Sequence, residues 1–398
     1  MIDDAIYWVW LQQVLKYGSH KIRTINLMYK DIKDFYNAGL NEWILCGCFT
    51  KKELNNLNSI KIEDVKIIID KCKMLEYDII CYSDEKYPER LKNIPNPPCV
   101  IYTKGLLPNL NNKICISVVG TRSCTLYGAQ MAFDLAHGLA KSEAIIVSGG
   151  AIGVDKAAHK GALQAGGKTI AVLGCGINYS YLMENASLRN TISKNGSVIS
   201  EYPPDYPAYS SNFPIRNRII AGLSMGTVVI EAGEKSGSII TANLAAEQGR
   251  DVFVVPVDMR SSVSKGTTAL IRDGAQIVTC SDDIINEYSN INIEKKENLK
   301  QLDKLKNIDF KVKVSKLSSH NINNTHKENK QIKKLPNMSD EAKDVYEFLK
   351  QGRHHIDEIC VNTKIPIRKL LGIITELEMF GLVKSYSGRM YSRADFIS

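Results

Sequence analysis

The residues best suited to chemistry are concentrated in the stretch 200–250. It combines an aromatic ring, two arginines flanking an amide, an apolar strand, and a turn of glycine and serine that opens a helix. The residues concerned are Phe213, Arg216, Asn217 and Arg218, and in the turn Lys235, Ser236, Gly237 and Ser238. Backbone N–H groups and the helix dipole at such a helix start favour anions, and planar guanidinium groups suit phosphate. The stretch therefore predicts a surface that binds phosphate groups.

Two more turns with glycine and polar residues follow predicted strands. The first offers Gly120 for a close backbone approach and Arg122 for an anion, although an arginine after a strand also serves in surface ion pairs. The second follows the strand at 145–147 and consists of Ser148, Gly149 and Gly150. Its glycines are not spaced as G-x-G-x-x-G, and no acidic residue follows about 20 positions later, so a dinucleotide site is not expected.

Three ionisable residues near these turns are candidates for catalysis. Asp155 is best explained as a helix cap, and His159 lies inside the same helix without a predictable partner. Glu231 either acts as a base or holds a loop amide, and the second role is favoured. The chain has no G-x-S-x-G, H-E-x-x-H or Walker A pattern. We therefore expect no enzymatic activity, catalytic residue or cofactor.

Composition narrows the class of protein further. The 398 residues allow two or three domains, and the net charge of +8 favours nucleic acid or another anionic partner. The ten cysteines form no C-x-x-C pair, so we expect free thiols in a reducing compartment and no metal site. The first residues lack the pattern of a signal peptide, and no apolar run reaches the ~20 residues that span a bilayer. A cytoplasmic location without membrane contact is expected.

Strands and helices alternate from 113 to 282. The strands are hydrophobic throughout, as in a parallel sheet covered on both faces. The pattern predicts a doubly wound, mostly parallel α/β domain whose ligands bind at the carboxyl ends of the strands. Every turn described above lies at that edge of the sheet.

The flanking segments have other compositions. Residues 1–80 predict a small helical domain, with a capping box at Thr50 and Glu53; packing or docking is favoured over DNA contact for its glycines. Prolines make 81–112 an extended tether with a short strand at 100–102.

The C-terminal part combines a linker with an ordered domain. Residues 283–338 are rich in lysine and asparagine and predict a flexible basic linker. Residues 339–398 predict three helices and a hairpin, the arrangement of a winged helix. Arg368, Lys369, Lys384 and Arg389 could contact DNA phosphates there, and a protein-docking role is equally open.

Taken together, these motifs resemble the DNA-processing protein A family (DprA/Smf). The resemblance rests on V-V-G-T-R, S-G-G-A-I-G-V-D, I-S-E-Y-P-P, F-P-I-R-N-R-I-I-A-G-L-S and S-G-S-I-I-T-A, in that order, and extends from Y-P-E-R-L to I-R-D-G-A. It implies an extended Rossmann-like domain, flanked by a small N-terminal helical domain (SAM or helix-hairpin-helix-like) and a C-terminal winged helix.

The resemblance also implies a function. Members bind single-stranded DNA as homodimers, protect it from nucleases and deliver it to the RecA recombinase during natural transformation and recombination. Residues in the matching motifs would form the groove: Gly120, Arg122, Ser148, Gly149, Gly150, Phe213, Arg216, Asn217, Arg218, Lys235, Ser236, Gly237 and Ser238.

Two departures from the family pattern bear on this expectation. Ile152 stands where the family usually has a cation, and Val257 with Asp258 follows Pro256 where the family usually has glycine. Two other functions stay open. The chain could be an enzyme or sensor for a nucleotide-derived small molecule, with Glu231 as its acid or base, or an adaptor that acts through its winged helix.

Overall fold

The structure is a computed structural model that describes residues 2–29, 31–288, 339–380, 382–386 and 390–394. It divides into two compact units, Met1–Asn286 and Glu287–Ser398, which are considered separately. A helix over 281–288 includes the first residues of the predicted linker, so regular structure continues past 283. The remainder of that linker, 289–338, lies outside the described residues.

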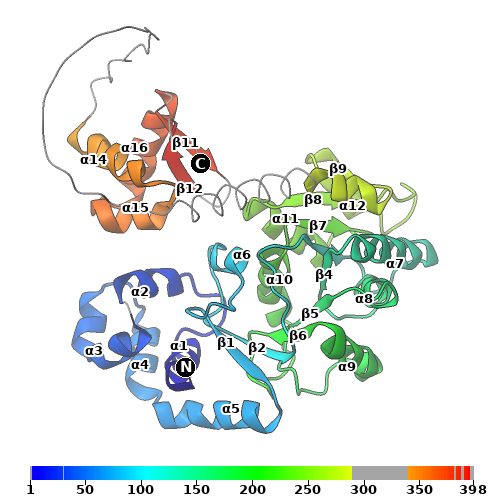
Figure 1. Cartoon of the computed structure of the whole chain (residues 1–398), viewed down its shortest axis with the longest axis horizontal. Helices are drawn as coiled ribbons and strands as arrows, with labels where there is room; N and C mark the ends of the chain where they lie inside the picture. The colour runs from blue at the N-terminus through cyan, green and yellow to red at the C-terminus, as the bar shows by residue number, and fades with distance from the viewer. Residues whose placement is uncertain (1, 30, 289–338, 381, 387–389, 395–398) are drawn as a thin grey trace, which may run out of the picture. The chain divides into compact units, whose positions relative to one another are not determined.

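The described part of unit 1 is built on one nine-stranded sheet, ordered β1-β2-β6-β5-β4-β3-β7-β8-β9 (Figure 1). Strands β3 to β9 pair in parallel, and β1 and β2 join one edge antiparallel. The bounds are β1 Asp78–Cys81, β2 Val100–Gly105, β3 Cys115–Val119, β4 Ile145–Ser148, β5 Thr169–Leu173, β6 Ser197–Ser200, β7 Gly226–Val229, β8 Asp251–Val254 and β9 Gln276–Ile277. The predicted mostly parallel sheet is confirmed.

Helices cover both faces of this sheet (Figure 1). One face carries α7 Leu126–Lys141, α8 Val154–Gln164 and α9 Ala186–Asn195, and the other carries α10 Asn212–Leu223 and α11 Gly237–Glu247. Helix α12, Lys265–Arg272, packs against β8 and α11. The chain moves outward from β3 through β4, β5 and β6 and then returns to β7 on the other side of β3. The end of β3 is therefore the switch point at which doubly wound sheets bind ligands.

The sheet begins earlier in the chain than the sequence indicates. The predicted strand at 100–102 is present as β2 and extends to Gly105. Its residues from Tyr102 to Gly105 pair with β6. The unpredicted strand β1 pairs with β2, so the predicted tether contributes residues 100–105 to the sheet edge. A short helix, α6 Glu89–Lys92, follows Pro88 and packs against α10. Strand β1 is only four residues long and half-exposed, which leaves little pattern to detect.

The N-terminal helices share their hydrophobic core with this sheet. They are α1 Ile2–Leu15, α2 Ile22–Met28, α3 Ile32–Leu45, α4 Lys51–Ser59 and α5 Ile62–Met74. The capping box is confirmed, since the Thr50 side chain accepts from the Glu53 amide and the Glu53 carboxylate accepts from the Thr50 amide. Trp8 packs against Tyr82, and the hydroxyl of Tyr102 on β2 donates to Gln12, 3.2 Å away. These contacts join the helices to the sheet edge.

Unit 2 has the predicted winged-helix form. Its described residues form α14 Asp340–Phe348, α15 Ile356–Thr363, α16 Ile367–Met379 and a sheet of β10 His354–His355, β12 Met390–Arg393 and β11 Val383–Tyr386. Among the predicted DNA contacts, Lys369 pairs with Glu341 at 2.7 Å and Lys384 is exposed. Arg389 and the side chain of Arg368 lie outside the described residues. In the described parts of both units, every helix is too short or too polar to cross a bilayer.

Candidate nucleic-acid interface

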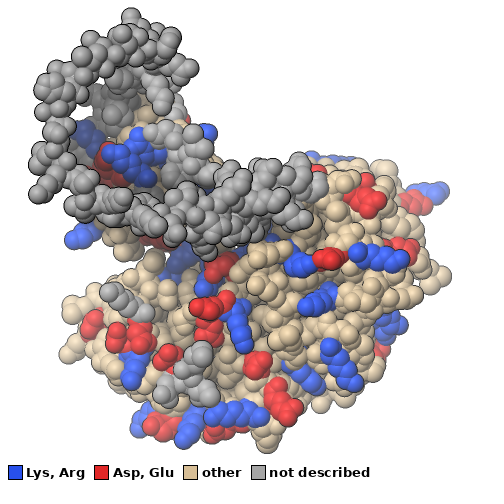
Figure 2. Space-filling view, viewed as in Figure 1, with Lys and Arg blue, Asp and Glu red and all other residues tan. Residues whose placement is uncertain are grey.

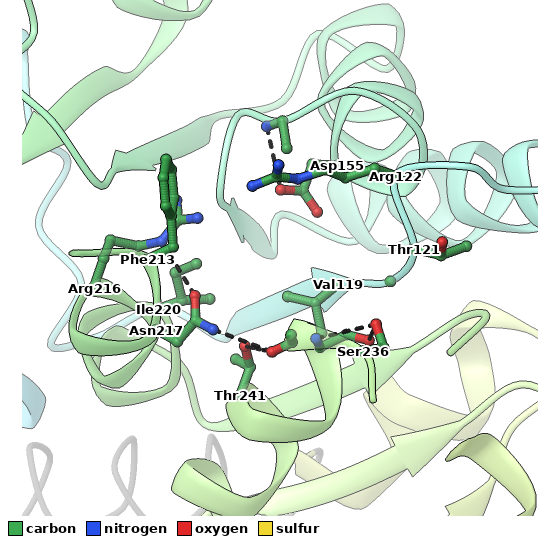
Figure 3. Close-up of a pocket in the computed structure, with 14 residues that line it drawn as sticks. Val119, Thr121, Arg122, Asp155, Phe213, Arg216, Asn217, Ile220, Ser236 and Thr241 are labelled. Carbon is green, nitrogen blue, oxygen red and sulfur yellow. Dashed lines mark hydrogen bonds between the residues drawn. The ribbon is translucent and has the colours of Figure 1, made fainter. Parts of the chain in front are cut away.

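A cavity of about 330 Å³ lies at the carboxyl end of β3, at the switch point of the sheet (Figure 3). It is enclosed by the turn after β3, the start of α8, one side of α10 and the start of α11. Its lining residues are Val119, Gly120, Thr121, Arg122, Ala151, Asp155, Phe213, Arg216, Asn217, Ile220, Ser236, Gly237, Ser238 and Thr241. The cavity brings together Gly120, Arg122, Phe213, Arg216, Asn217 and the turn Ser236–Ser238 from the predicted set. Thr121, Asp155 and Thr241 are additions to it.

The helical phase of α10 decides which of its residues face this cavity. No helix is predicted for this segment from the sequence, which presents Phe213, Arg216, Asn217 and Arg218 as one group of candidate contacts. Residues three and four apart share a helix face, so Phe213, Arg216 and Asn217 all line the cavity. At about 100° per residue, Arg218 points ~140° away from Phe213.

Arg218 is therefore buried away from the cavity, and we no longer expect it to contact DNA. Its guanidinium lies 2.6 Å from the Glu201 carboxylate, and both side chains are 2% exposed. Glu201 follows β6, and Gly18, in the chain after α1, lies against the pair, since a Cβ there would be 3.8 Å from Arg218 Nε. The buried pair joins α10 to the sheet and to the N-terminal helices.

Phe213 is the centre of a cationic cluster. The guanidinium carbons of Arg122 and Arg216 lie 5.3 Å and 5.8 Å from its ring centroid, within cation–π range. The ring rests on the backbone of Gly174, after β5, where a Cβ would come within 2.8 Å of it. Arg122 faces Phe213 from the opposite side of the cavity (Figure 3). Its side chain is exposed, and no hydrogen bond or ion pair holds its guanidinium within the described residues.

Arg216 has a different role from Arg122 because it is only 5% exposed. Its Nη1 donates to the carbonyl of Gly149 at 2.8 Å and to that of Val172, and its Nε donates to Asn217. The two carbonyls belong to the ends of β4 and β5. Arg216 thus holds these strand ends in place while its charge stays beside Phe213.

The turn Ser148–Gly150, also predicted to contact DNA, is not part of the cavity lining. The Ser148 hydroxyl is buried and donates to the carbonyl of Val118 at 2.7 Å. The backbone amide of Ala151, directly after the turn, donates to Asp155 at 3.3 Å.

Asp155 is the acidic residue that lines the cavity. It is not the cap of α8, because Gly153 is the N-cap residue, and it instead holds the preceding turn. Burial raises the pKa of Asp155, and the neighbouring Arg216 guanidinium opposes this by favouring the carboxylate. That guanidinium offsets the negative charge which would otherwise repel a phosphate.

The start of α11 forms the far wall of the cavity. Asn217 donates to the carbonyl of Gly237 at 3.1 Å, and Ser236 caps the helix by accepting from the amide of Ser238. A Cβ on Gly237 would meet nothing within 4 Å, so the backbone is open to a ligand there. Lys235 is exposed and is not among the lining residues.

The turn after β3 is held by a buried carboxylate. Glu231 accepts from the amide of Thr125 at 2.9 Å and from its hydroxyl at 2.6 Å. The expectation that Glu231 holds a loop amide is confirmed. Gly120 is required by packing, since a Cβ would come within 2.6 Å of Val154 on α8.

His159 is a structural residue of the core. It is buried, and its Nδ1 lies 2.7 Å from the hydroxyl of Thr169. Burial lowers its pKa to about 3, so the imidazole is neutral at ordinary pH. No group of His, Cys, Asp and Glu in the described ranges has the arrangement of a metal site.

The two departures from the family pattern lie outside the cavity. Ile152 is half-buried and is absent from the lining. Asp258 pairs with Arg260 at 3.0 Å, so the carboxylate of that loop is partly neutralised within the loop itself.

Comparison with known proteins identifies the family. The family model for DNA recombination-mediator protein A matches residues 78–289, and that for the DprA winged helix domain matches 332–389. DNA processing protein DprA of Streptococcus pneumoniae is 40% identical over 228 residues, which are 57% of this chain and 79% of that protein. DprA of Bacillus subtilis is 39% identical over 53% of this chain and 71% of that protein.

A solved structure agrees with the sequence matches. The X-ray structure of DprA from Streptococcus pneumoniae aligns with a TM-score of 0.61 and 34% identity, covering 70% of this chain and 95% of that one. Protein Smf of Synechocystis is 33% identical over 78% of both chains. This chain therefore belongs to the DNA recombination-mediator protein A family, the DprA/Smf family of DNA-processing proteins.

Proposed function

We propose that the cavity at the end of β3 binds single-stranded DNA. The observation that carries this proposal is the exposed guanidinium of Arg122, which faces the Phe213 ring and makes no hydrogen bond or ion pair with the described residues. An unpaired base can stack on an aromatic ring while a guanidinium binds the adjacent phosphate. Arg216 offsets the charge of Asp155, and the N-terminus of α11 adds positive potential at the same place.

The position of Phe213 favours a single strand over a duplex. The ring is half-buried between Gly174 and the two guanidinium groups, so only a base that has left its partner can reach its face. Figure 2 shows Lys and Arg interspersed with Asp and Glu over the visible face of unit 1.

The wider role follows from membership of the family. As a cytoplasmic protein, the chain would protect incoming single-stranded DNA and deliver it to the RecA recombinase, acting as a homodimer and without catalysis. Glu231 is a poor general acid or base because both of its oxygens accept hydrogen bonds from Thr125. Asp155 is the carboxylate that lines the cavity. It accepts from the amide of Ala151, and the Arg216 guanidinium offsets its negative charge.

The test is fluorescence anisotropy with a labelled oligothymidylate, measured over a range of salt concentrations. Loss of one phosphate contact in Arg122→Ala lowers the slope of log affinity against log salt by about 0.7. Phe213→Ala removes a stacking partner and weakens binding by about 1–3 kcal/mol with an unchanged slope.

Arg260→Ala is the matched control. Arg260 is 91% exposed, lies outside the cavity lining, and carries the same charge as Arg122. Equal losses in Arg122→Ala and Arg260→Ala would show that general charge, not the cavity, binds DNA. Steady release of base from nucleoside monophosphates would instead support a small-molecule enzyme.

A further inference from the structure

A second cavity is lined by the loop after β5, which also contacts Phe213 of the first cavity. The loop after β5 starts at Gly174, beneath the Phe213 ring, and returns to that ring at Tyr181, whose centroid is 5.4 Å from that of Phe213. Residues of the same loop line the second cavity, which measures about 170 Å³. Its lining residues are Tyr77, Lys104, Ile177, Asn178, Tyr179, Ser180, Met183, Ala186, Arg189, Asn190 and Val198. Tyr181 therefore stands between the two cavities.

The charge of the second cavity suits an anion. Lys104 on β2 and Arg189 on α9 line it, and its lining includes no Asp or Glu among the described residues. Two acidic groups adjoin the lining without being part of it: Asp205 accepts from Asn178 and pairs with Lys71 at 3.2 Å, and Glu184 is exposed. A phosphate would meet two cations there without a facing carboxylate.

Arg189 keeps the loop in the shape that connects the cavities. Its guanidinium donates to the carbonyl of Tyr181 at 2.7 Å and to that of Leu182 at 3.1 Å. The amide of Tyr181 donates to the carbonyl of Tyr179 at 2.8 Å, which tightens the turn. These bonds hold Tyr181 against Phe213 and leave Tyr179 39% exposed and Met183 63% exposed at the second cavity. An exposed aromatic ring beside cations is the arrangement with which proteins bind unpaired strands.

We propose that this second cavity, referred to below as the Lys104 subsite, binds further nucleotides of the same single strand. The strand would pass from Phe213 over Tyr181, stack a base on Tyr179 and place a phosphate near Lys104 and Arg189. The proposal rests on the proposed function, because it extends the strand from the first cavity. It predicts that longer oligonucleotides gain affinity from contacts that short ones cannot make.

The experiment compares a short oligothymidylate, which fills only the first cavity, with progressively longer ones by anisotropy. Lys104→Ala is expected to bind the short oligonucleotide like the wild type and to lower the salt slope for long ones by about 0.7. Tyr179→Ala is expected to weaken binding of the long ones by about 5-fold or more. Lys141→Ala, which removes an exposed lysine on α7, is the matched control and should follow the wild type at every length.

The outcomes separate the two proposals. One outcome is that Arg122→Ala binds DNA more weakly than the wild type, while both subsite variants match the wild type at all lengths. The Lys104 subsite is then refuted and the first proposal stands. If the wild type binds no oligonucleotide, both proposals fail. Equal thermal unfolding of all variants shows that the changes are not due to misfolding, as expected for exposed or half-buried side chains.

Discussion

The buried pair between Arg218 and Glu201 gives the sharpest test of the structure against the sequence motif. The motif places Arg218 beside Arg216 in a DNA-binding group, whereas the structure gives it a role in stability. Arg218→Met retains much of the side-chain volume but removes the partner of a carboxylate that is 2% exposed. Breaking a buried pair on one side costs about 3–5 kcal/mol, because an uncompensated charge stays inside.

Such a loss is large against the ~5–15 kcal/mol by which domains are stable. Loss of the pair should also destabilise the N-terminal helices, since Gly18, in the chain after α1, lies against Arg218. The three tryptophans of the chain, Trp8, Trp10 and Trp43, are all buried in the N-terminal helices. Urea unfolding followed by tryptophan fluorescence therefore reports on the helices that the pair attaches to the sheet, and circular dichroism reports on the whole chain.

Two controls make the result interpretable. Arg260→Met on the exposed loop should change the free energy of unfolding by less than about 0.5 kcal/mol. The double variant Arg218→Met with Glu201→Leu removes both charges and should recover much of the lost stability, because no unpaired charge is left buried. If Arg218→Met unfolds like the wild type but loses DNA affinity as Arg122→Ala does, the structural role assigned to Arg218 is refuted.

Two further predictions test the support of the cavity and the core. Gly174→Ala places a Cβ 2.8 Å from the Phe213 ring, so the ring must move. Anisotropy should then show weaker DNA binding with an unchanged salt slope. Unchanged affinity would contradict the proposed stacking position. His159 has a pKa lowered to about 3 by burial, so the unfolded chain binds its proton first as the pH falls below about 6.5. Stability should therefore fall between about pH 6.5 and 3, by about 1.4 kcal/mol per pH unit, and urea titrations of His159→Asn should lack this component of the slope.

Much of the fold is readable from the sequence because it depends on local pattern. Continuous apolar runs separated by helical segments predict a parallel sheet, and they correspond to β3 to β8. The capping box at Thr50 and the amide-holding role of Glu231 were also predicted, the first from close spacing and the second from position at a strand end. The winged helix follows from apolar spacing along its helices. The alternation also predicts the edge of the sheet at which the cavity lies.

Tertiary structure decided which residues reach that cavity. Phe213, Arg216 and Arg218 are close in sequence, but the phase of α10 and its packing against Glu201 send Arg218 into the core. The turn Ser148–Gly150 suggested phosphate contacts, yet the Ser148 hydroxyl is buried and donates to the carbonyl of Val118. Tyr181 joins the site from a loop that carries no motif, because the course of that loop is set by Arg189 and by contact with Phe213. Local sequence pattern specifies helices and strands. The direction of a polar side chain depends on the residues that it contacts, and these are distant in sequence and are brought close only by folding.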